Sequence, residues 1–146
     1  MISVRLFLPV FFLMGGLCFA QNTSSGAAGS GLKPCPKSPN CVSSEAVDPE
    51  HAILPLVYPG SPEEARARLR RVLAAMPRMT IVADESDHIR AEARSLIFRF
   101  VDDVEFYFPA GENVIHVRSA SRVGHSDLGV NRKRVEEIRR RFGELK

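Results

Sequence analysis

Residues 96–122, LIFRFVDDVEFYFPAGENVIHVRSASR, decide the fold because they contain the clearest alternation in the chain. Apolar side chains recur at every second position along much of 96–108, and the turn-forming run 109–113 separates them from a second alternating stretch, 114–122. Such alternation is typical of strands that bury one face. We therefore predict two antiparallel strands whose buried face carries these side chains: Leu96, Phe98, Phe100, Val104, Phe106 and Phe108.

One pairing register of this hairpin agrees best with side-chain chemistry. It sets apolar residues opposite apolar ones and charges opposite charges of the other sign. In this register Phe108 faces Ile115, Asp102 faces Ser121, and Glu105 faces Arg118.

Asp102 interrupts the apolar face, because alternation points its carboxylate inward among phenylalanines. A buried carboxylate without partners is strongly destabilising. Either a β-bulge at Asp102 and Asp103 turns the carboxylate outward, or internal donors satisfy it. Ser119, Ser121 and Arg122 are the candidate donors, and the sequence is compatible with both arrangements.

Two further strands are predicted upstream, at residues 79–83 and 89–95, joined by the polar turn 84–87. Residues 53–58 form a short extended run that Pro55 interrupts. Proline cannot donate to a central ladder, so this run is expected to be an edge or an arm.

Helices are predicted on both sides of the strands. Ser61 and Glu64 form a capping box ahead of an apolar stripe at helical spacing, and Pro77 ends that stripe. The second helix begins at Asn131 as its N-cap and ends at Gly143.

The predicted order is therefore helix, four strands, helix. Short connections favour neighbouring antiparallel strands. We predict an α+β fold: a four-stranded antiparallel meander sheet with two helices on one face, preceded by a Cys/Pro-rich N-terminal arm. Residues 33–146 are expected to form this single α+β domain.

The first twenty residues have the layout of a secretory signal peptide. Arg5 precedes an apolar run, and Ala20 closes it with a small residue. We predict a signal peptide at 1–20, a flexible Ser/Gly/Ala-rich tail at 21–32, and no transmembrane segment in the mature chain. The protein is expected to be exported, either periplasmic or secreted. The alternative is a membrane-tethered lipoprotein, acylated at Cys18.

Charge argues against nucleic acid as a partner. Removing residues 1–20 takes one basic residue and no acidic residue from totals of 20 and 17, which leaves a formal charge of +2. A balance so close to neutral, in an exported chain, gives no electrostatic basis for nucleic-acid binding.

Export also bears on the cysteines. Cys35 and Cys41 remain as an even pair in an oxidising compartment, within a proline-rich segment. A disulfide between them would contribute about 2 kcal/mol by the loop-entropy model. Metal binding or a reactive thiol are the alternatives. No second ligand pair lies near at zinc spacing, so we assign no metal and no cofactor.

Polar residues gather where the last strand enters the final helix. A helix N-terminus favours negative charge, so this junction is a candidate site for a small anionic ligand. The same side chains are also able to tie strand, loop and helix together. The cluster comprises Asp102, Asp103, Arg118, Ser119, Ser121, Arg122, His125, Asp127, Asn131, Arg132 and Arg134.

Two functional hypotheses follow. The first is a non-catalytic binding or interaction module for a small anionic ligand or an envelope protein. The second is a hydrolase or thiol-dependent enzyme that uses Cys41, His125 and Asp127 as nucleophile, base and orienting group. The enzyme hypothesis is the weaker one, because nothing in the sequence sets the distances among the three residues.

Three motifs carry a family resemblance: PCPKSPNCVSS at 34–44, RFVDDVEF at 99–106, and the run 118–136. Together they make the chain similar to the bacterial and plant family named domain of unknown function 1499, over about residues 32–146. That family includes lipoproteins and exported or membrane-attached members, which suits the predicted signal. The resemblance implies no activity, cofactor or catalytic residue.

Overall fold

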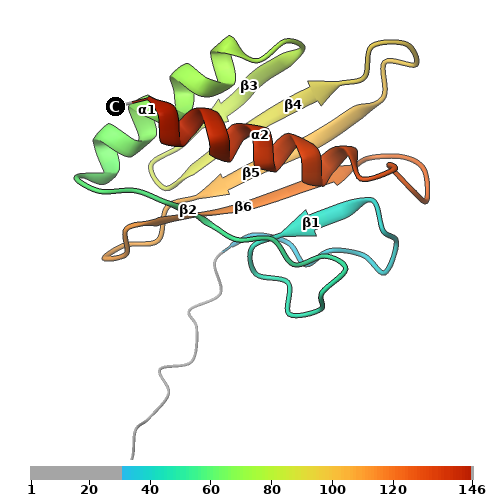
Figure 1. The fold of residues 1–146 in the computed structure, drawn as a ribbon, viewed down its shortest axis with the longest axis horizontal. Coiled ribbons are helices and arrows are strands. Elements are labelled where there is room, and N and C mark those ends of the chain that lie inside the picture. Colours follow the sequence, from blue (N-terminus) through green and yellow to red (C-terminus); the bar gives the residue numbers. More distant parts are fainter. Residues whose placement is uncertain (1–30, 146) are drawn as a thin grey trace, which may run out of the picture.

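The strands form one antiparallel sheet in this computed structural model, which describes residues 31–145. The predicted signal peptide, Cys18 and residues 21–30 of the predicted tail lie outside the described residues. The strands are β1 (Cys41–Ser43), β2 (Leu56–Val57), β3 (Met79–Asp84), β4 (His88–Arg94), β5 (Val101–Tyr107) and β6 (Val114–Ser121). Their order in the sheet is β1-β6-β5-β4-β3, and β2 also pairs with β6 (Figure 1).

The meander of β3 to β6 is present, but the predicted count of four strands was too low. β1 pairs with residues 118–120 of β6, and β2 pairs with residues 114–115. β1 comes from the Cys/Pro-rich segment that was expected to be an arm, and β2 comes from the run 53–58 that was expected to be an edge or an arm. They are too short to show a period of their own, so their pairing with β6 is what makes them strands.

The predicted hairpin register is confirmed. Asp102 pairs with Ser121, and Glu105 pairs with Arg118. The register between β5 and β6 is continuous from Asp102 to Tyr107, so no bulge turns the Asp102 carboxylate outward.

The start of β5 was predicted wrongly. The strand begins at Val101 rather than Leu96, because Ser95 N–H donates to the Phe100 carbonyl at 2.9 Å and closes a loop between β4 and β5. Leu96, Phe98 and Phe100 are 72, 73 and 52% exposed instead of buried. Alternation shows which side chains share a face, but it does not show where the helices stop covering that face.

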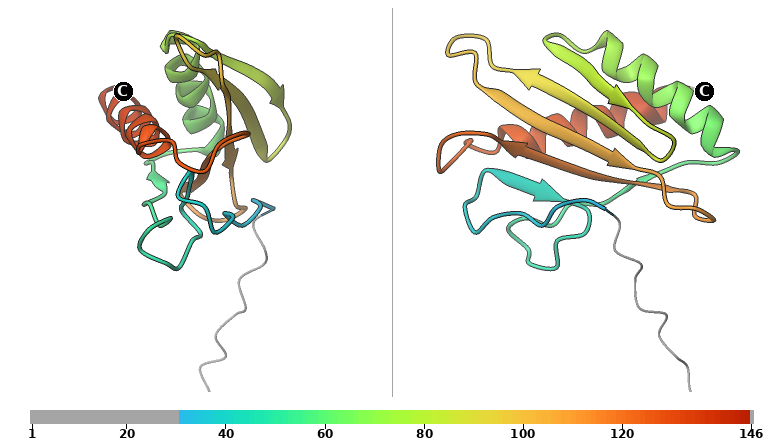
Figure 2. Two further views of the ribbon diagram at one scale, coloured as in Figure 1. Left: turned by 90° about the vertical axis from the view of Figure 1, so that its right-hand side faces the viewer. Right: turned by 180° about the vertical axis from the view of Figure 1, so that it is seen from behind.

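Two helices cover one face of the sheet, as expected (Figures 1 and 2). α1 (Pro62–Ala75) has the predicted capping box, with the Glu64 N–H bonded to Ser61 Oγ and the Ser61 N–H bonded to the Glu64 carboxylate. α2 (Val130–Glu144) differs at both ends from the prediction.

Gly129, not Asn131, is the N-cap of α2, and the helix continues through Gly143 to Glu144. Asn131 lies inside the first turn, where its side chain is fully buried. Val135, Ile138 and Phe142 pack against the sheet in the core, as their spacing predicts.

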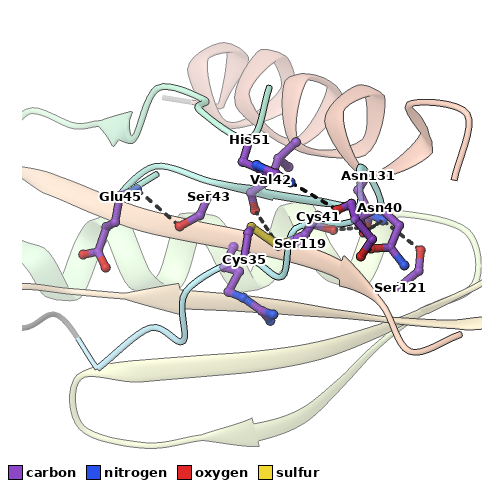
Figure 3. The surroundings of a disulfide bond; sticks show 12 residues. Cys35, Asn40, Cys41, Val42, Ser43, Glu45, His51, Ser119, Ser121 and Asn131 are labelled. Atoms are coloured by element: carbon purple, nitrogen blue, oxygen red, sulfur yellow. Dashed lines mark hydrogen bonds between the residues drawn. A yellow bond between two sulfur atoms is a disulfide. The ribbon is translucent and has the colours of Figure 1, made fainter. Parts of the chain in front are cut away.

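The Cys35–Cys41 disulfide is present and ties the proline-rich arm to β1 (Figure 3). From Cys35 the arm extends back towards β4, where Gly31 lies so close to the His88 ring that a side chain at residue 31 would touch it. The arm therefore crosses part of the sheet face that the helices leave open. No helix in residues 31–145 has both the length and the apolar character needed to span a membrane.

His51 links the disulfide-bonded loop to the turn that follows β1. It is buried, and both ring nitrogens face acceptors: Nε2 lies 3.1 Å from the Ser38 carbonyl and Nδ1 lies 2.6 Å from the Asp48 carboxylate. Only the protonated ring donates to both. The Ser38 carbonyl, and to a lesser extent Asp48, raise the pKa of His51 against the opposing effect of burial.

We predict that the free energy of unfolding declines as pH rises. Because the folded-state pKa of His51 is raised, the stabilisation that its protonated ring provides is complete below the ordinary histidine pKa of about 6.5. This stabilisation is lost as pH rises through the folded-state pKa. Urea unfolding across neutral pH measures the slope. His51→Gln should flatten it, whereas His125→Gln, a change at an exposed loop position, should leave it intact. An equal slope in the wild type and His51→Gln would contradict this assignment.

Candidate functional site

A buried ion pair lies at the centre of the predicted polar cluster. Asp102 points into the helix-covered face from β5 and is 6% exposed. Its Oδ2 accepts a hydrogen bond from Arg134 Nη2 of α2 at 2.5 Å. Of the two arrangements left open by the sequence, the inward carboxylate is the one present, and its partner is Arg134 rather than Ser119, Ser121 or Arg122.

Asn131 connects the elements around this pair. Its Oδ1 accepts from Ser119 Oγ at 2.5 Å and from Arg134 Nη1 at 2.6 Å. Its Nδ2 lies 3.0 Å from Ser121 Oγ and 3.1 Å from the Asn40 carbonyl. Figure 3 shows these side chains gathered where α2 begins, beside β1 and β6. One buried amide therefore joins the helix to both strands.

Asp127 occupies the N-terminus of α2. Its carboxylate accepts from the Gly129 N–H at 2.9 Å and from the Asn131 N–H at 2.8 Å. The helix N-terminus was expected to attract an external anion, but the chain supplies its own carboxylate there.

The two arginines that point to the open face are engaged with neighbouring carboxylates. Arg118 Nη1 bonds Glu105 at 3.2 Å, and Arg122 forms ion pairs with Asp103 and Glu92. Arg122 lowers the pKa of Glu92 through its hydrogen bond. These contacts join β4, β5, β6 and the following loop on the face opposite the helices.

The remaining basic member of the cluster also has an internal role. Arg132 donates to the carbonyls of Ala52 and Glu50 at 2.8 and 2.7 Å and so holds the segment between β1 and β2. His125 is exposed and has no hydrogen bond within residues 31–145. All four arginines of the cluster are thus bonded within the chain.

The arrangement of Cys41, His125 and Asp127 offers no nucleophile. Cys41 is buried and disulfide-bonded, so it carries no free thiolate. Asp127 is occupied at the helix N-terminus. No group of three or more His, Cys, Asp or Glu side chains among residues 31–145 is arranged to hold a metal ion.

Two concave surfaces lie beside the cluster. The first, which we call the polar hollow, has a volume of about 330 Å³ and is lined by Asp102, Ser121, Asp127 and residues of both adjoining loops. The second, which we call the basic groove, has a volume of about 500 Å³ and lies between the end of α1, the strands β3 and β4, and α2. Ser95 and Val130 line both, so the two surfaces are continuous.

The basic groove carries more positive charge than its own carboxylate balances. Its basic side chains are Arg78, Arg94, Lys133, Arg134 and Arg141, and its acidic side chain is Glu137. Arg94, Arg134 and Arg141 are paired with carboxylates. Arg78 bonds only to the Arg94 carbonyl, and Lys133 has no partner within the described part of the chain. Two cations of the groove therefore lack a counter-ion among residues 31–145.

Sequence reasoning missed this groove. Arg78 and Lys133 belong to different elements, and no linear pattern brings them together. Leu96, which also lines the groove, had been assigned to the core. Folding is what combines the α1–β3 turn, the β4–β5 loop and the first turns of α2.

A second group of missed residues crosses the open face. The rings of His88 and Tyr107 lie 4.8 Å apart, and those of Tyr107 and His116 lie 6.4 Å apart. His116 Nδ1 also lies 3.1 Å from Ser44 Oγ. The predicted register already placed Tyr107 opposite His116, so that signal was present in the sequence.

Comparison with known proteins found one related family. The family model described as "Protein of unknown function (DUF1499)" matches residues 31–142. No curated protein matches the chain.

Neighbouring aspartates allow a matched test of the buried pair. We predict that Asp102→Asn lowers the free energy of unfolding by about 3 kcal/mol, because it leaves Arg134 buried without its counter-ion. Asp103→Asn removes a more exposed ion pair with Arg122 and should cost less than about 1 kcal/mol. Urea unfolding of both variants measures the difference. Equal losses would show that the buried pair has no special role.

Proposed function

This chain belongs to the DUF1499 family, and because the family's description assigns no activity, we propose its function from its own residues. The domain is an exported, non-catalytic binding module, and it holds a small anionic ligand with an apolar part in the basic groove. The observation that carries this proposal is the pair of cations, Arg78 and Lys133, that face the groove without a carboxylate partner.

Electrostatics favour the basic groove over the polar cluster as the site that binds an anion. Arg118, Arg122, Arg132 and Arg134 are all bonded internally, and an anion would have to displace those partners. Arg78 and Lys133 would lose only water. In a partly enclosed site, a charged hydrogen-bond donor gains when a charged acceptor replaces its water.

The groove also has an apolar lining. Met76, Met79, Leu96 and Val130 contribute side chains between the cations. Methionine adapts its shape readily, and an exposed leucine beside it gains from being covered. The combination fits a ligand with one anionic group and a hydrocarbon portion better than a small inorganic ion.

The polar cluster holds the elements around this groove in place, and Arg134 is the cluster member that also lines the groove. Arg134 pairs with Asp102 on one side and lines the groove on the other. The buried Asn131 bonds hold the first turn of α2 against β6. These bonds therefore fix the end of α2 from which Lys133 and Val130 line the groove.

Export is supported by the predicted signal peptide and by the disulfide, which is typical of oxidising compartments. In such a compartment the domain would meet envelope lipids, fatty acids and other anionic amphiphiles.

Binding of dodecyl phosphate, below its critical micelle concentration, tests the proposal by titration calorimetry. The wild type should bind it and should bind the uncharged dodecyl maltoside much more weakly. Lys133→Glu should weaken binding at least about tenfold, because a charged hydrogen bond is replaced by repulsion. The variant should fold, since a carboxylate in the first turn of a helix is favourable.

Arg71→Glu provides the matched control, because Arg71 is an exposed basic residue of α1 outside the groove. It should bind dodecyl phosphate as the wild type does. Equal affinity in Lys133→Glu and the wild type, or equal affinity for the charged and uncharged detergents, would refute the proposed site.

A further inference from the structure

Exposed apolar side chains concentrate at one end of the sheet. Among the described residues, seven of the eleven large apolar side chains that are exposed belong to the β4–β5 loop or to the segment from Val123 to Val130. Leu128 is 86% exposed, and the Phe98 and Phe100 rings stack with centroids 5.5 Å apart. Six of these seven, all except Val130, form what we call the apolar rim: Leu96, Ile97, Phe98, Phe100, Val123 and Leu128.

The rim is one surface, although it comes from two loops. Both loops lie at the same end of the sheet (Figures 1 and 2). The Arg122 N–H donates to the Val101 carbonyl at 3.2 Å, and Phe100 and Val123 line the polar hollow together. Isolated exposed apolar residues are ordinary, whereas a contiguous group of this kind marks an interaction surface.

Uncompensated positive charge accompanies the rim. Arg99 lies between Phe98 and Phe100 in the loop and has no ion pair within residues 31–145. Lys133 and Arg78 lie in the adjoining groove. Of the acidic residues at this end, Glu92, Asp102 and Asp103 are each paired with an arginine, and Asp127 is bonded to N–H groups at the start of α2. The net field here therefore favours an anionic partner.

Backbone strain supports a role for the loop side chains. Arg78, Arg99 and Leu128 have φ of +59°, +54° and +53°, and they are the non-glycine residues with positive φ in the described chain. Each lies in a loop at this end of the sheet. This conformation costs an ordinary side chain about 1 kcal/mol and costs glycine little. Within residues 31–145 the Arg99 side chain has no ion pair, and the bond at Leu128 is one from its N–H to Ser126 Oγ at 3.3 Å.

We propose that the apolar rim docks on a lipid bilayer that contains anionic lipid, with rim side chains inserted at the level of the headgroups and with Arg99, Lys133 and Arg78 facing lipid phosphates. A bilayer of this kind is apolar in its acyl-chain region and anionic at its headgroups. Exposed apolar loop side chains with cations beside them fit both regions. A bilayer requires no shape complementarity from these exposed loop side chains, which favours it over a protein partner.

The inference deepens the proposed function, on which it rests for the chemistry of the anion. Ser95 and Val130 connect the two concave surfaces at this end, and Leu96 belongs to both the rim and the basic groove. A docked domain would therefore present the groove to the lipids, and an anionic lipid would reach it without crossing bulk water.

Vesicle co-sedimentation of the purified protein tests the inference. We expect binding to mixed phosphatidylcholine and phosphatidylglycerol vesicles, little binding to pure phosphatidylcholine, and weaker binding as salt is raised. The double variant Leu96→Ser, Phe98→Ser should lower the affinity at least about tenfold, because two inserted side chains are lost. Arg99→Glu should lower it about fivefold or more.

The double variant Leu54→Ser, Val57→Ser is the matched control. These side chains are also exposed, at 74 and 71%, but they line a different concave surface with Phe142 of α2. The control should bind vesicles as the wild type does, and thermal unfolding should show that every variant is folded, since all the changed side chains are exposed.

Failure of this inference differs from failure of the proposed function. If dodecyl phosphate binds but vesicles do not, the rim does not dock on bilayers, and its surface is reassigned to a protein partner or to a second copy of the chain. Equal loss of vesicle binding in the rim variant and the Leu54, Val57 control would also overturn the inference. If vesicles bind through the rim but dodecyl phosphate does not bind the groove, the docking surface stands and the proposed function fails.

Discussion

The buried carboxylate of Asp102 is the constraint on which this end of the molecule depends. A charge inside an apolar face is tolerated only with a partner, and α2 supplies it through Arg134. This ion pair and the core packing of Val135, Ile138 and Phe142 together hold α2 across the sheet. Asn131, three residues before Arg134, then bonds to β6 and to the residue before β1, and Asp127 occupies the start of the helix. The loop between β6 and α2 is therefore positioned by polar contacts rather than by apolar burial.

The same contacts divide the charged residues into two groups. Arginines that face carboxylates or carbonyls inside the chain hold elements together, and removal of a buried partner would leave a desolvated charge. Among the described residues the side chains of Arg99 and Lys133 have no such partner, and Arg78 bonds to the Arg94 carbonyl but to no carboxylate. All three lie around exposed apolar side chains. Structure and binding are thus assigned to neighbouring but separate residues: the polar cluster holds the loops and α2 in place, and the rim and the basic groove face outward.

Local chemistry predicted much of the fold. The capping box of α1 and the register of β5 with β6 were both confirmed, because each depends on contacts between residues close in the sequence or related by one turn. The burial of Leu96, Phe98 and Phe100 was predicted wrongly. The Ser95 N–H bonds to the Phe100 carbonyl and closes a loop, so strand β5 begins only at Val101. β1 was missed as a strand, and the run that contains β2 was predicted only as an edge or an arm, because β6 supplies the partner of both. The groove was missed because it exists only where three distant segments meet.

A single tryptophan at the loop tip tests the membrane contact most directly. The chain contains no tryptophan, so Phe98→Trp introduces a unique fluorophore into the apolar rim. The account predicts that its emission shifts to shorter wavelength on vesicles that contain phosphatidylglycerol and is quenched when the acyl chains are brominated. Emission that keeps the same wavelength and intensity at saturating lipid would contradict it.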